Sequence, residues 1–270
     1  MYFSKDNKTY YYEVRGEGFP VVMLHGFTGS SATWQNFIDK WGSGYQIITI
    51  DLPGHGKTRT PSLRSMEECL QDLNKLFQSL GLETFHLLGY SMGGRTALSY
   101  TILYPEQVST LILESASPGL EDVKERRLRQ KNDEMLAIRI EQEGVPSFVD
   151  YWQDIPLFHS QKSLPLKVQK IIRSERLSQT KEGLSLSLRT MGTGSQLSLW
   201  SRLRTLDMPV LMIIGELDPK FVAINKKMQS KLKSGNLKIC EDAGHAIHVE
   251  KPRNFGKMVI GFLNGTTKLD

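Results

Sequence analysis

The segment Gly89-Tyr90-Ser91-Met92-Gly93 carries the pattern Gly-x-Ser-x-Gly, and the fold can be worked out from it. A strand pattern, Thr84–Leu88, precedes the segment and a helix pattern, Met92–Tyr104, follows it. In this context the pattern is typical of a serine held in a sharp strand-to-helix turn, which exposes the hydroxyl group above the edge of a sheet. Such a turn is crowded and strained, so it needs glycine on either side. The segment therefore predicts that Ser91 is an activated serine.

The same alternation of strand and helix patterns continues on both sides of this turn. Short apolar runs bounded by turn residues favour buried strands, and longer periodic stretches favour helices. Strands that alternate with helices predict a mostly parallel sheet with helices on both faces. The further candidates, in chain order, are Val21–Leu24, Trp34–Trp41, Gln46–Ile50, Ser65–Leu80 and Val108–Glu114. Near the amino end, Thr9–Arg15 followed by Gly16-Glu17-Gly18 predicts a β-hairpin.

The alternation stops after Leu120. Residues 121–204 have mostly helical patterns without a strand candidate, and strands resume at Pro209–Gly215 and Leu237–Cys240 before a last helix, Pro252–Leu263. We therefore expect residues 1–120 and 205–270 to form the core and residues 121–204 to form a helical cap. Such a cap would cover the carboxyl ends of the strands, where open α/β sheets bind ligands. Most of the chain's excess positive charge falls in this segment.

Composition narrows the class of protein. The chain has 270 residues with a net charge of +5, and 39% of its residues are hydrophobic and 23% charged, as in soluble globular proteins. It has no basic run interleaved with aromatic residues, no apolar run of about 18 residues and no apolar signal region at its amino end. Cys69 and Cys240 are far apart and belong to no Cys-x-x-Cys pair. We expect a cytoplasmic monomer without nucleic-acid partner, stable membrane association or metal.

An activated serine needs a base, and a histidine is suited to that task because its pKa lies near neutrality. His245 lies in the loop Glu241–His245, directly after the last strand candidate. His248 is the competing candidate, but we interpret it as a structural histidine at the start of a helix. The remaining histidines are interpreted as structural or surface residues: His25, His55, His86 and His159.

The base in turn needs a carboxylate to orient it, and oxygen charge on a substrate needs hydrogen-bond donors. In enzymes with this type of serine turn the acid comes between the serine and the histidine in the chain. Asp218, just after the strand candidate Val210–Gly215, fits that order. Glu216 and Glu114 are weaker alternatives. The backbone N–H groups of Met92 and Phe27 are the candidate donors of an oxyanion hole.

Several motifs together resemble the α/β-hydrolase superfamily along essentially the whole chain. They are His25-Gly26-Phe27, Asp51–Gly56, Gly89–Gly94, Gly215–Asp218 and Gly244-His245. The resemblance implies an α/β-hydrolase fold, but that fold hosts many chemistries. A narrower resemblance is to the 2-succinyl-6-hydroxy-2,4-cyclohexadiene-1-carboxylate synthases of menaquinone biosynthesis. The Arg-rich start of the cap carries it together with Tyr90–Arg95, Glu114–Leu120, Asp150–Phe158 and Met191–Gln196. This resemblance implies a lyase that eliminates pyruvate from a small polycarboxylate substrate without a cofactor.

Arg95 supports the narrower resemblance on physical grounds. It follows Ser91 by four residues on the same predicted helix, about one turn further along. A guanidinium group there is unusual for an ester or lipid hydrolase and is suited to a bidentate grip on a carboxylate. The resemblance implies further substrate contacts from Tyr90, Arg129, Trp152 and Arg173. Arg126 and Arg127 compete with Arg129, Arg176 competes with Arg173, and a solvated helix face or cap packing remains the alternative role.

The implied mechanism uses the serine as a base. Asp218 and His245 would raise the basicity of Ser91, which would remove the ring proton next to the succinyl carbonyl group. The N–H groups of Phe27 and Met92 would hold the enolate oxygen, and the enolpyruvyl group would leave without an acyl-enzyme. A carboxylesterase or C–C bond hydrolase with the same residues is the first alternative, and a ligand sensor with very slow turnover is the second.

Overall fold

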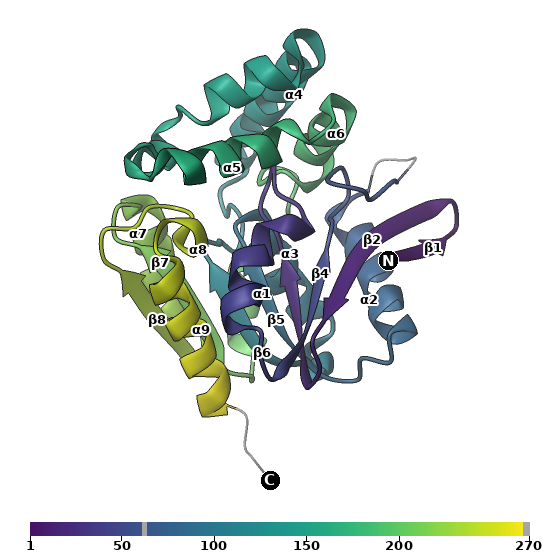
Figure 1. The fold of residues 1–270 in the computed structure, drawn as a ribbon, viewed down its shortest axis with the longest axis vertical. Helices are drawn as coiled ribbons and strands as arrows, with labels where there is room; N and C mark the ends of the chain where they lie inside the picture. Colours follow the sequence, from purple (N-terminus) through teal and green to yellow (C-terminus); the bar gives the residue numbers. More distant parts are fainter. Residues whose placement is uncertain (61–63, 267–270) are drawn as a thin grey trace.

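One sheet organises the molecule (Figure 1). The structure is a computed structural model that describes residues 1–60 and 64–266, and residues 267–270 of the predicted core lie outside the described residues. The strand order is β1-β2-β4-β3-β5-β6-β7-β8. The strands are β1 Tyr2–Lys5, β2 Lys8–Arg15, β3 Phe19–Leu24, β4 Tyr45–Ile50, β5 Phe85–Tyr90, β6 Val108–Glu114, β7 Val210–Gly215 and β8 Gly235–Cys240. Strands β3 to β8 pair in parallel, which confirms the predicted mostly parallel sheet.

The predicted hairpin between Thr9–Arg15 and the next strand is wrong. β2 pairs antiparallel with β1 and β4, whereas β3 lies between β4 and β5. The glycines Gly16 and Gly18 still turn the chain, with φ angles of 74° and 122°. The carboxyl-terminal part of β3 is buried, and this strand lies in the interior of the sheet. β2 is partly exposed and lies near an edge of the sheet. β1, which we did not predict, joins β2 through Asp6 and Asn7, whose φ angles are 51° and 59°.

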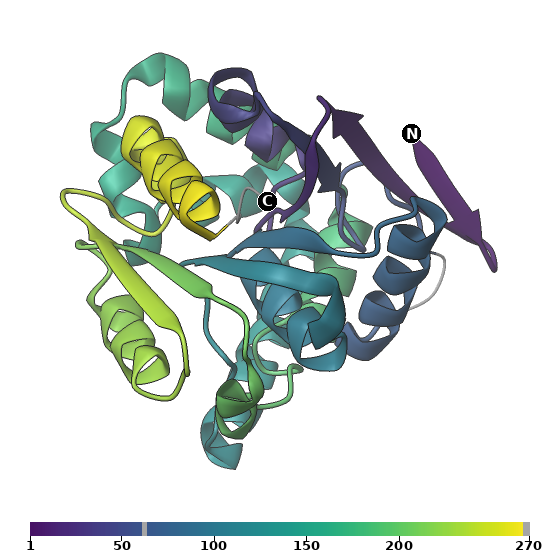
Figure 2. The ribbon, with the colours of Figure 1, turned by 90° about the horizontal axis from the view of Figure 1, so that it is seen from below.

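Helices cover both faces of the sheet, as Figure 2 shows from below. α1 and α9 lie on one face, and α2, α3 and α7 lie on the other. Trp34, Phe37 and Phe255 pack in the first layer, and Phe77 and Tyr100 pack in the second. The core helices are α1 Gln35–Trp41, α2 Met66–Ser79, α3 Met92–Leu103, α7 Pro219–Gln229, α8 Ile247–Glu250 and α9 Pro252–Thr266, with short 3₁₀ turns η1 Ser31–Trp34, η2 Pro105–Gln107 and η4 Trp200–Thr205.

Between β6 and β7 the chain leaves the sheet and forms only helical elements. The first four of them, α4 Val123–Trp152, η3 Pro156–Ser163, α5 Leu166–Leu177 and α6 Lys181–Met191, are called the helical cap, and η4 leads back to β7. Figure 1 shows α4, α5 and α6 above one edge of the sheet. α4 is kinked at Gly144, where φ is 81° and ψ is 170°. The kink divides α4 into two helical segments, and residues on both sides of it pack in one apolar cluster with Leu184 and Leu188 of α6.

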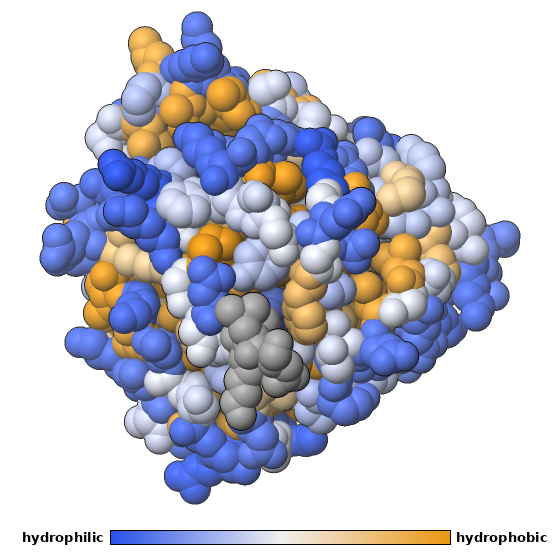
Figure 3. Space-filling view, turned by 60° about the horizontal axis from the view of Figure 1, so that its bottom comes forward, coloured by the Kyte–Doolittle hydropathy of each residue, from blue (hydrophilic) through white to orange (hydrophobic). Residues whose placement is uncertain are grey.

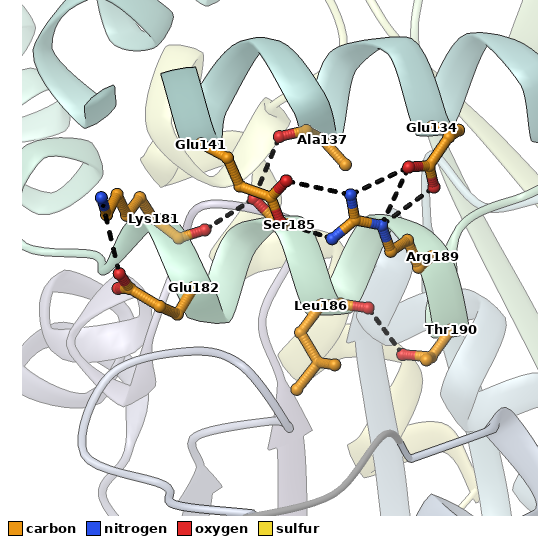
Figure 4. A network of polar contacts seen from close by, with 9 residues as sticks. All are labelled: Glu134, Ala137, Glu141, Lys181, Glu182, Ser185, Leu186, Arg189 and Thr190. Carbon is orange, nitrogen blue, oxygen red and sulfur yellow. Dashed lines mark hydrogen bonds and ion pairs between the residues drawn. The ribbon is translucent and has the colours of Figure 1, made fainter. Parts of the chain in front are cut away.

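Arg189 of α6 joins this helix to α4 through two carboxylates (Figure 4). Its Nε and Nη2 atoms donate to Glu134, each with a 2.9 Å bond, and Nη1 and Nη2 donate to Glu141. Ser185 Oγ adds a 3.1 Å hydrogen bond to the carbonyl oxygen of Ala137. Since Arg189 sits between two carboxylates in a bidentate geometry, the network fixes the relative position of the two cap helices.

Replacing Arg189 with alanine should loosen the cap. Because the side chains are partly exposed, we expect the free energy of unfolding to fall by only about 1 kcal/mol. Protease cleavage within α4 or α6 should nevertheless become faster, and both quantities can be measured by chemical denaturation and limited proteolysis. Lys162→Ala, which removes a single exposed ion pair to Asp154 in the cap, is the matched control. Equal effects of the two substitutions would contradict the role of the network.

The end of the molecule opposite the cap is mainly polar. Figure 3 shows that hydrophilic side chains cover most of this face and that apolar residues form separate patches. Such a mixed surface is usual where a protein meets water. Among the described residues, no helix combines the length and the apolar character that crossing a bilayer requires.

Candidate active site

Ser91 occupies the turn between β5 and α3, with φ of 50° and ψ of −106°. The backbone is therefore in the left-handed region, which costs conformational energy for a residue other than glycine. The Ser91 N–H group donates a 2.8 Å hydrogen bond to the carbonyl oxygen of Glu114 at the end of β6. This bond ties the turn to the neighbouring strand and leaves the side chain at the edge of the sheet.

The flanking glycines are required by close packing. A Cβ atom on Gly89 would lie 2.3 Å from the carbonyl oxygen of Gly93, and one on Gly93 would lie 2.2 Å from that of Leu24. Both are backbone contacts that no rotation of a side chain could relieve. The expected need for glycine on either side of Ser91 therefore has a direct steric cause.

Ser91, His245 and Asp218 lie within hydrogen-bond distance in series. The Nδ1 atom of His245 is 2.7 Å from Asp218 Oδ2, and its Nε2 atom is 3.1 Å from Ser91 Oγ. Since a carboxylate only accepts, Nδ1 carries the proton and Nε2 accepts from the serine hydroxyl group. Phe221 N donates to Asp218 Oδ1, and the Phe221 ring packs on the imidazole. The arrangement can draw the proton from Ser91.

The alternative acids and the alternative base do not reach Ser91. Glu216 is exposed and accepts from the backbone of Asp242. Glu114 is fully buried and accepts from both the backbone N–H and Nδ1 of His248, at 2.9 Å. His248 and Glu114 therefore form a separate buried pair, in keeping with a structural histidine.

Phe27 lies in the loop after β3, and two neutral histidines shape this loop. His55 Nε2 accepts from Thr28 N, and His25 Nε2 accepts from Leu52 N. Burial lowers the pKa of His25 to about 4 and that of His55 to about 3, so both stay uncharged at neutral pH. In the described chain, no protein acceptor is found for the N–H groups of Phe27 or Met92, which both line the same cavity as Ser91.

A cavity of about 1000 Å³ lies between the sheet edge and the cap. Ser91 and His245 line it from the core, and α4 and α6 line it from the cap. Such a volume is large enough for a ligand of drug-like size. Tyr90, Arg95, Arg129 and Trp152, four of the five predicted substrate contacts, also line it. Among the described residues, no cluster of His, Cys, Asp and Glu is placed to hold a metal ion.

Arg95 is a buried cation in this cavity. It is 8% exposed, and it donates to the carbonyl oxygen of Met191 at 2.9 Å and to Gln196 Oε1 at 3.1 Å. Desolvation, with a smaller contribution from the charge of Arg129, lowers the pKa of Arg95 to about 10, so it remains protonated at neutral pH. Both hydrogen-bond acceptors of Arg95 are neutral, and the nearby charge of Asp133 favours its protonated form, so Arg95 can bind an anionic ligand.

Arg129 and Arg173 differ in their position relative to the cavity. Arg129 lines the cavity while its Nε atom donates to Asp133 at 2.8 Å, whereas its competitors Arg126 and Arg127 do not line the cavity. The structure does not bring Arg173 to the cavity. Its guanidinium group lies 2.6 Å from Asp150 and donates to Gln153, both at the end of α4.

Arg176, the competitor of Arg173, points inward from the same helix. It is buried, donates to Gln161 at 3.0 Å and lies over the ring of Phe158. It lines a small cavity of about 50 Å³ together with Tyr90, Glu175 and His248. Desolvation lowers the pKa of Arg176. The expectation for Arg173 is therefore corrected: Arg176, three residues further along α5, faces the core instead.

The profile of the alpha/beta hydrolase fold family matches residues 20–252, which is most of the chain. The chain belongs to the α/β-hydrolase fold family. A candidate 2-succinyl-6-hydroxy-2,4-cyclohexadiene-1-carboxylate synthase of Bacillus subtilis (strain 168) is 48% identical over 90% of this chain and 89% of its own length. The synthase of that name from Enterobacter sp. (strain 638) is 30% identical, over 87% and 88%.

A solved structure shows the same similarity. MenH from S. aureus superposes with a TM-score of 0.92 and 37% identity, over 95% of this chain and 99% of that one. The predicted α/β-hydrolase fold is thereby confirmed, and the chain is an α/β-hydrolase-fold enzyme that resembles these synthases along almost its whole length. A thermophilic esterase from Thermogutta terrifontis, 24% identical with a TM-score of 0.85, shares the fold.

In this α/β-hydrolase-fold enzyme, Glu175 of α5 connects the cap to the loop that carries Phe27. Its Oε1 atom accepts from Ser30 N and Ser30 Oγ, both at 3.0 Å, and from Thr33 Oγ1 at 2.7 Å. Desolvation raises the pKa of Glu175 despite these hydrogen bonds. Sequence patterns did not single out Glu175, because its partners are some 140 residues away in the chain.

Glu175→Gln should change how the free energy of unfolding of this enzyme depends on pH. A raised pKa means that the folded state keeps the proton longer than the unfolded state, so wild-type stability falls as pH rises through the folded pKa. Glutamine keeps the Oε1 acceptor and does not titrate. The free energy of unfolding of the variant, minus that of the wild type, should therefore increase between pH 4 and pH 8 in chemical denaturation. Glu182→Gln, at an exposed residue of α6, is the control, and a flat or falling difference for Glu175→Gln would contradict the idea.

Proposed function

We propose that this enzyme is a lyase of menaquinone biosynthesis. It would eliminate pyruvate from 2-succinyl-5-enolpyruvyl-6-hydroxy-3-cyclohexene-1-carboxylate and form 2-succinyl-6-hydroxy-2,4-cyclohexadiene-1-carboxylate. Its similarity to synthases of that name over most of their length supports the proposal. The observation that carries it is Arg95, a buried and protonated guanidinium group in the cavity of Ser91. A substrate with several carboxylates needs such a group, and a neutral ester does not.

The reaction begins with removal of a proton from ring carbon 2, next to the succinyl carbonyl group. Ser91 Oγ takes this proton while its own proton passes to His245 Nε2. Asp218 holds the imidazole ring in the required tautomer and stabilises its charge when it is protonated. This is general base catalysis by a serine, and no covalent bond to the substrate forms.

Negative charge then develops on the succinyl carbonyl oxygen. The N–H groups of Phe27 and Met92, which line the cavity beside Ser91, donate to that oxygen and stabilise the enolate. The electron pair moves from carbon 2 through the ring double bond and breaks the C–O bond at carbon 5. Enolpyruvate leaves, takes up a proton and becomes pyruvate, so the reaction needs no oxidant or cofactor.

The carboxylates of the substrate are held by the basic side of the cavity. The charge of Arg129 is close enough to Arg95 to lower the pKa of Arg95, and both arginines line the cavity. Trp152 packs at 5.5 Å from the Phe27 ring and closes the apolar side, while Tyr90 borders Ser91. The two arginines anchor the anionic groups and thereby place carbon 2 above Ser91.

A serine hydrolase remains the second candidate, because the same Ser91–His245–Asp218 geometry would serve acyl transfer. The buried Arg95 favours the lyase. The test is pyruvate release from the enolpyruvyl substrate, followed with lactate dehydrogenase and NADH, beside hydrolysis of a neutral aryl ester. Fast pyruvate release with slow ester hydrolysis would support the lyase, and the reverse would support the hydrolase. The cytoplasmic location and the monomeric state stay predictions.

A further inference from the structure

The loop that carries His245 is bound by Glu250, a carboxylate that takes no part in the proposed chemistry. Gly244 N donates to Glu250 Oε2 at 2.6 Å, and Ala246 N donates to Glu250 Oε1 at 3.2 Å. The two peptide N–H groups that flank His245 are therefore held by the two oxygens of one side chain. Glu250 is 9% exposed and does not line the large cavity, so it can act on the substrate only through the loop.

These two amides are the hydrogen-bond donors that hold the Glu250 carboxylate. In the part of the chain that the structure describes, no lysine or arginine forms an ion pair with it. A buried carboxylate must be hydrogen-bonded to remain charged without a large energetic cost, and bonds to a charged acceptor are stronger than neutral ones. The Glu250 carboxylate therefore needs the N–H groups of Gly244 and Ala246 as donors, and these groups use the carboxylate as their acceptor.

The rest of the loop is fixed by other contacts before and after this point. Leu217 N donates to the carbonyl oxygen of Ala243 at 2.9 Å, and His248 N donates to Glu114. A Cβ atom on Gly244 would lie 2.1 Å from Ser160 Oγ, so the cap packs directly on the loop. Between these anchors, Glu250 binds the N–H groups of the two residues on either side of His245, Gly244 and Ala246.

We propose that Glu250 is a positioning residue, which holds the backbone on both sides of His245 so that the imidazole ring meets Ser91 and Asp218 together. The inference rests on the proposed roles of Ser91 and His245 and not on the identity of the substrate. A displacement of the ring by about 1 Å from such a geometry can slow a reaction about 100-fold. Glu250 thus contributes to the rate without touching the substrate.

Glu250→Gln tests the proposal with little change in volume. The amide oxygen can accept from one of the two N–H groups, but the amide nitrogen is a donor and would face the other. The rate of Ser91 labelling by a fluorophosphonate is the main readout, since it needs an activated serine and not the natural substrate. We expect labelling to be about 10- to 100-fold slower. In pyruvate release, kcat should fall by the same factor while KM stays near the wild-type value.

Asp72→Asn is the matched control. Asp72 is another buried carboxylate, in α2, where Lys8, Tyr10 and Arg64 bind it, and it does not line the cavity of Ser91. Its loss should lower the melting temperature and leave the labelling rate unchanged. The low-field proton resonance of the His245–Asp218 hydrogen bond should shift or broaden in Glu250→Gln and stay as in the wild type in Asp72→Asn.

Glu250→Asp covers the case in which the glutamine variant does not fold. It keeps the charge but is too short to bind both amides, so its labelling should also be slow. Labelling of either folded Glu250 variant at the wild-type rate would overturn the proposal, as would an equal loss in Asp72→Asn. A wild-type protein that is labelled rapidly but releases no pyruvate would contradict the proposed function and leave the role of Glu250 standing.

Discussion

Ser91→Ala should lower kcat for pyruvate release by about 10⁴-fold, the scale seen when a member of such a triad is removed. The reason is that Ser91 Oγ, 3.1 Å from His245 Nε2, is the group that takes the ring proton. Alanine cannot do so, and no other serine hydroxyl group is hydrogen-bonded to His245 among the described residues. Because Arg95 and Arg129 remain in place, the variant should still bind the substrate with near wild-type affinity.

The two quantities can be measured separately. Lactate dehydrogenase coupling gives kcat, and calorimetric titration of the inactive variant with substrate gives the dissociation constant. Ser79→Ala, at the end of α2 and away from the cavity, is the control and should leave both unchanged. A Ser91→Ala variant that keeps a tenth or more of the activity would show that another group removes the proton.

Arg95→Ala should lower kcat/KM for pyruvate release by about 100- to 1,000-fold. Truncation of one partner in a buried charge pair costs about 2–5 kcal/mol, and about 1.4 kcal/mol corresponds to tenfold. The site would lose a cation that is 8% exposed, whose two protein partners are a carbonyl oxygen and a neutral amide. Arg95→Lys should recover only part of the loss, because an ammonium group cannot form the bidentate contact.

The loss must be separated from damage to the cap, since Arg95 also holds Met191 and Gln196. A neutral fluorophosphonate reports on Ser91 without needing a carboxylate contact. Its labelling rate should stay within a few fold of the wild type in Arg95→Ala, while pyruvate release collapses. If labelling and pyruvate release fall together, Arg95 is a structural residue and the case for the lyase weakens.

The sequence predicted the parts of the site that depend on strand ends. Ser91, Asp218 and His245 follow β5, β7 and β8, and parallel strands bring such positions to one edge. Their spacing across 154 residues did not matter, because the sheet sets their separation. Gly89 is required for a local reason, since a Cβ atom there would meet the backbone of Gly93, whereas Gly93 is required by the backbone of Leu24 in β3.

The cap was less predictable. Arg173 and Arg176 lie three residues apart on α5, and only packing decides which of them faces inward. One contact of α5 with the core joins Glu175 to Ser30, and a contact between residues so far apart in the chain leaves no periodic signal. Gln196 ends the segment Met191–Gln196, which carries the narrower resemblance, but the sequence did not predict its contact with Arg95. The wrong hairpin has the same origin, because β2 pairs with β4 and not with the next strand in the chain. The edge strand β1 was missed for another reason, since it is mostly exposed and has no buried apolar run.

The backbone at Ser91 has a consequence for how this enzyme can change. Its φ of 50° is a conformation that glycine adopts freely and serine does not. Selection for thermal resistance alone would thus favour glycine at the very position that performs the chemistry. Folding and turnover make opposite demands on this single residue, so its identity can persist only while the reaction itself is under selection.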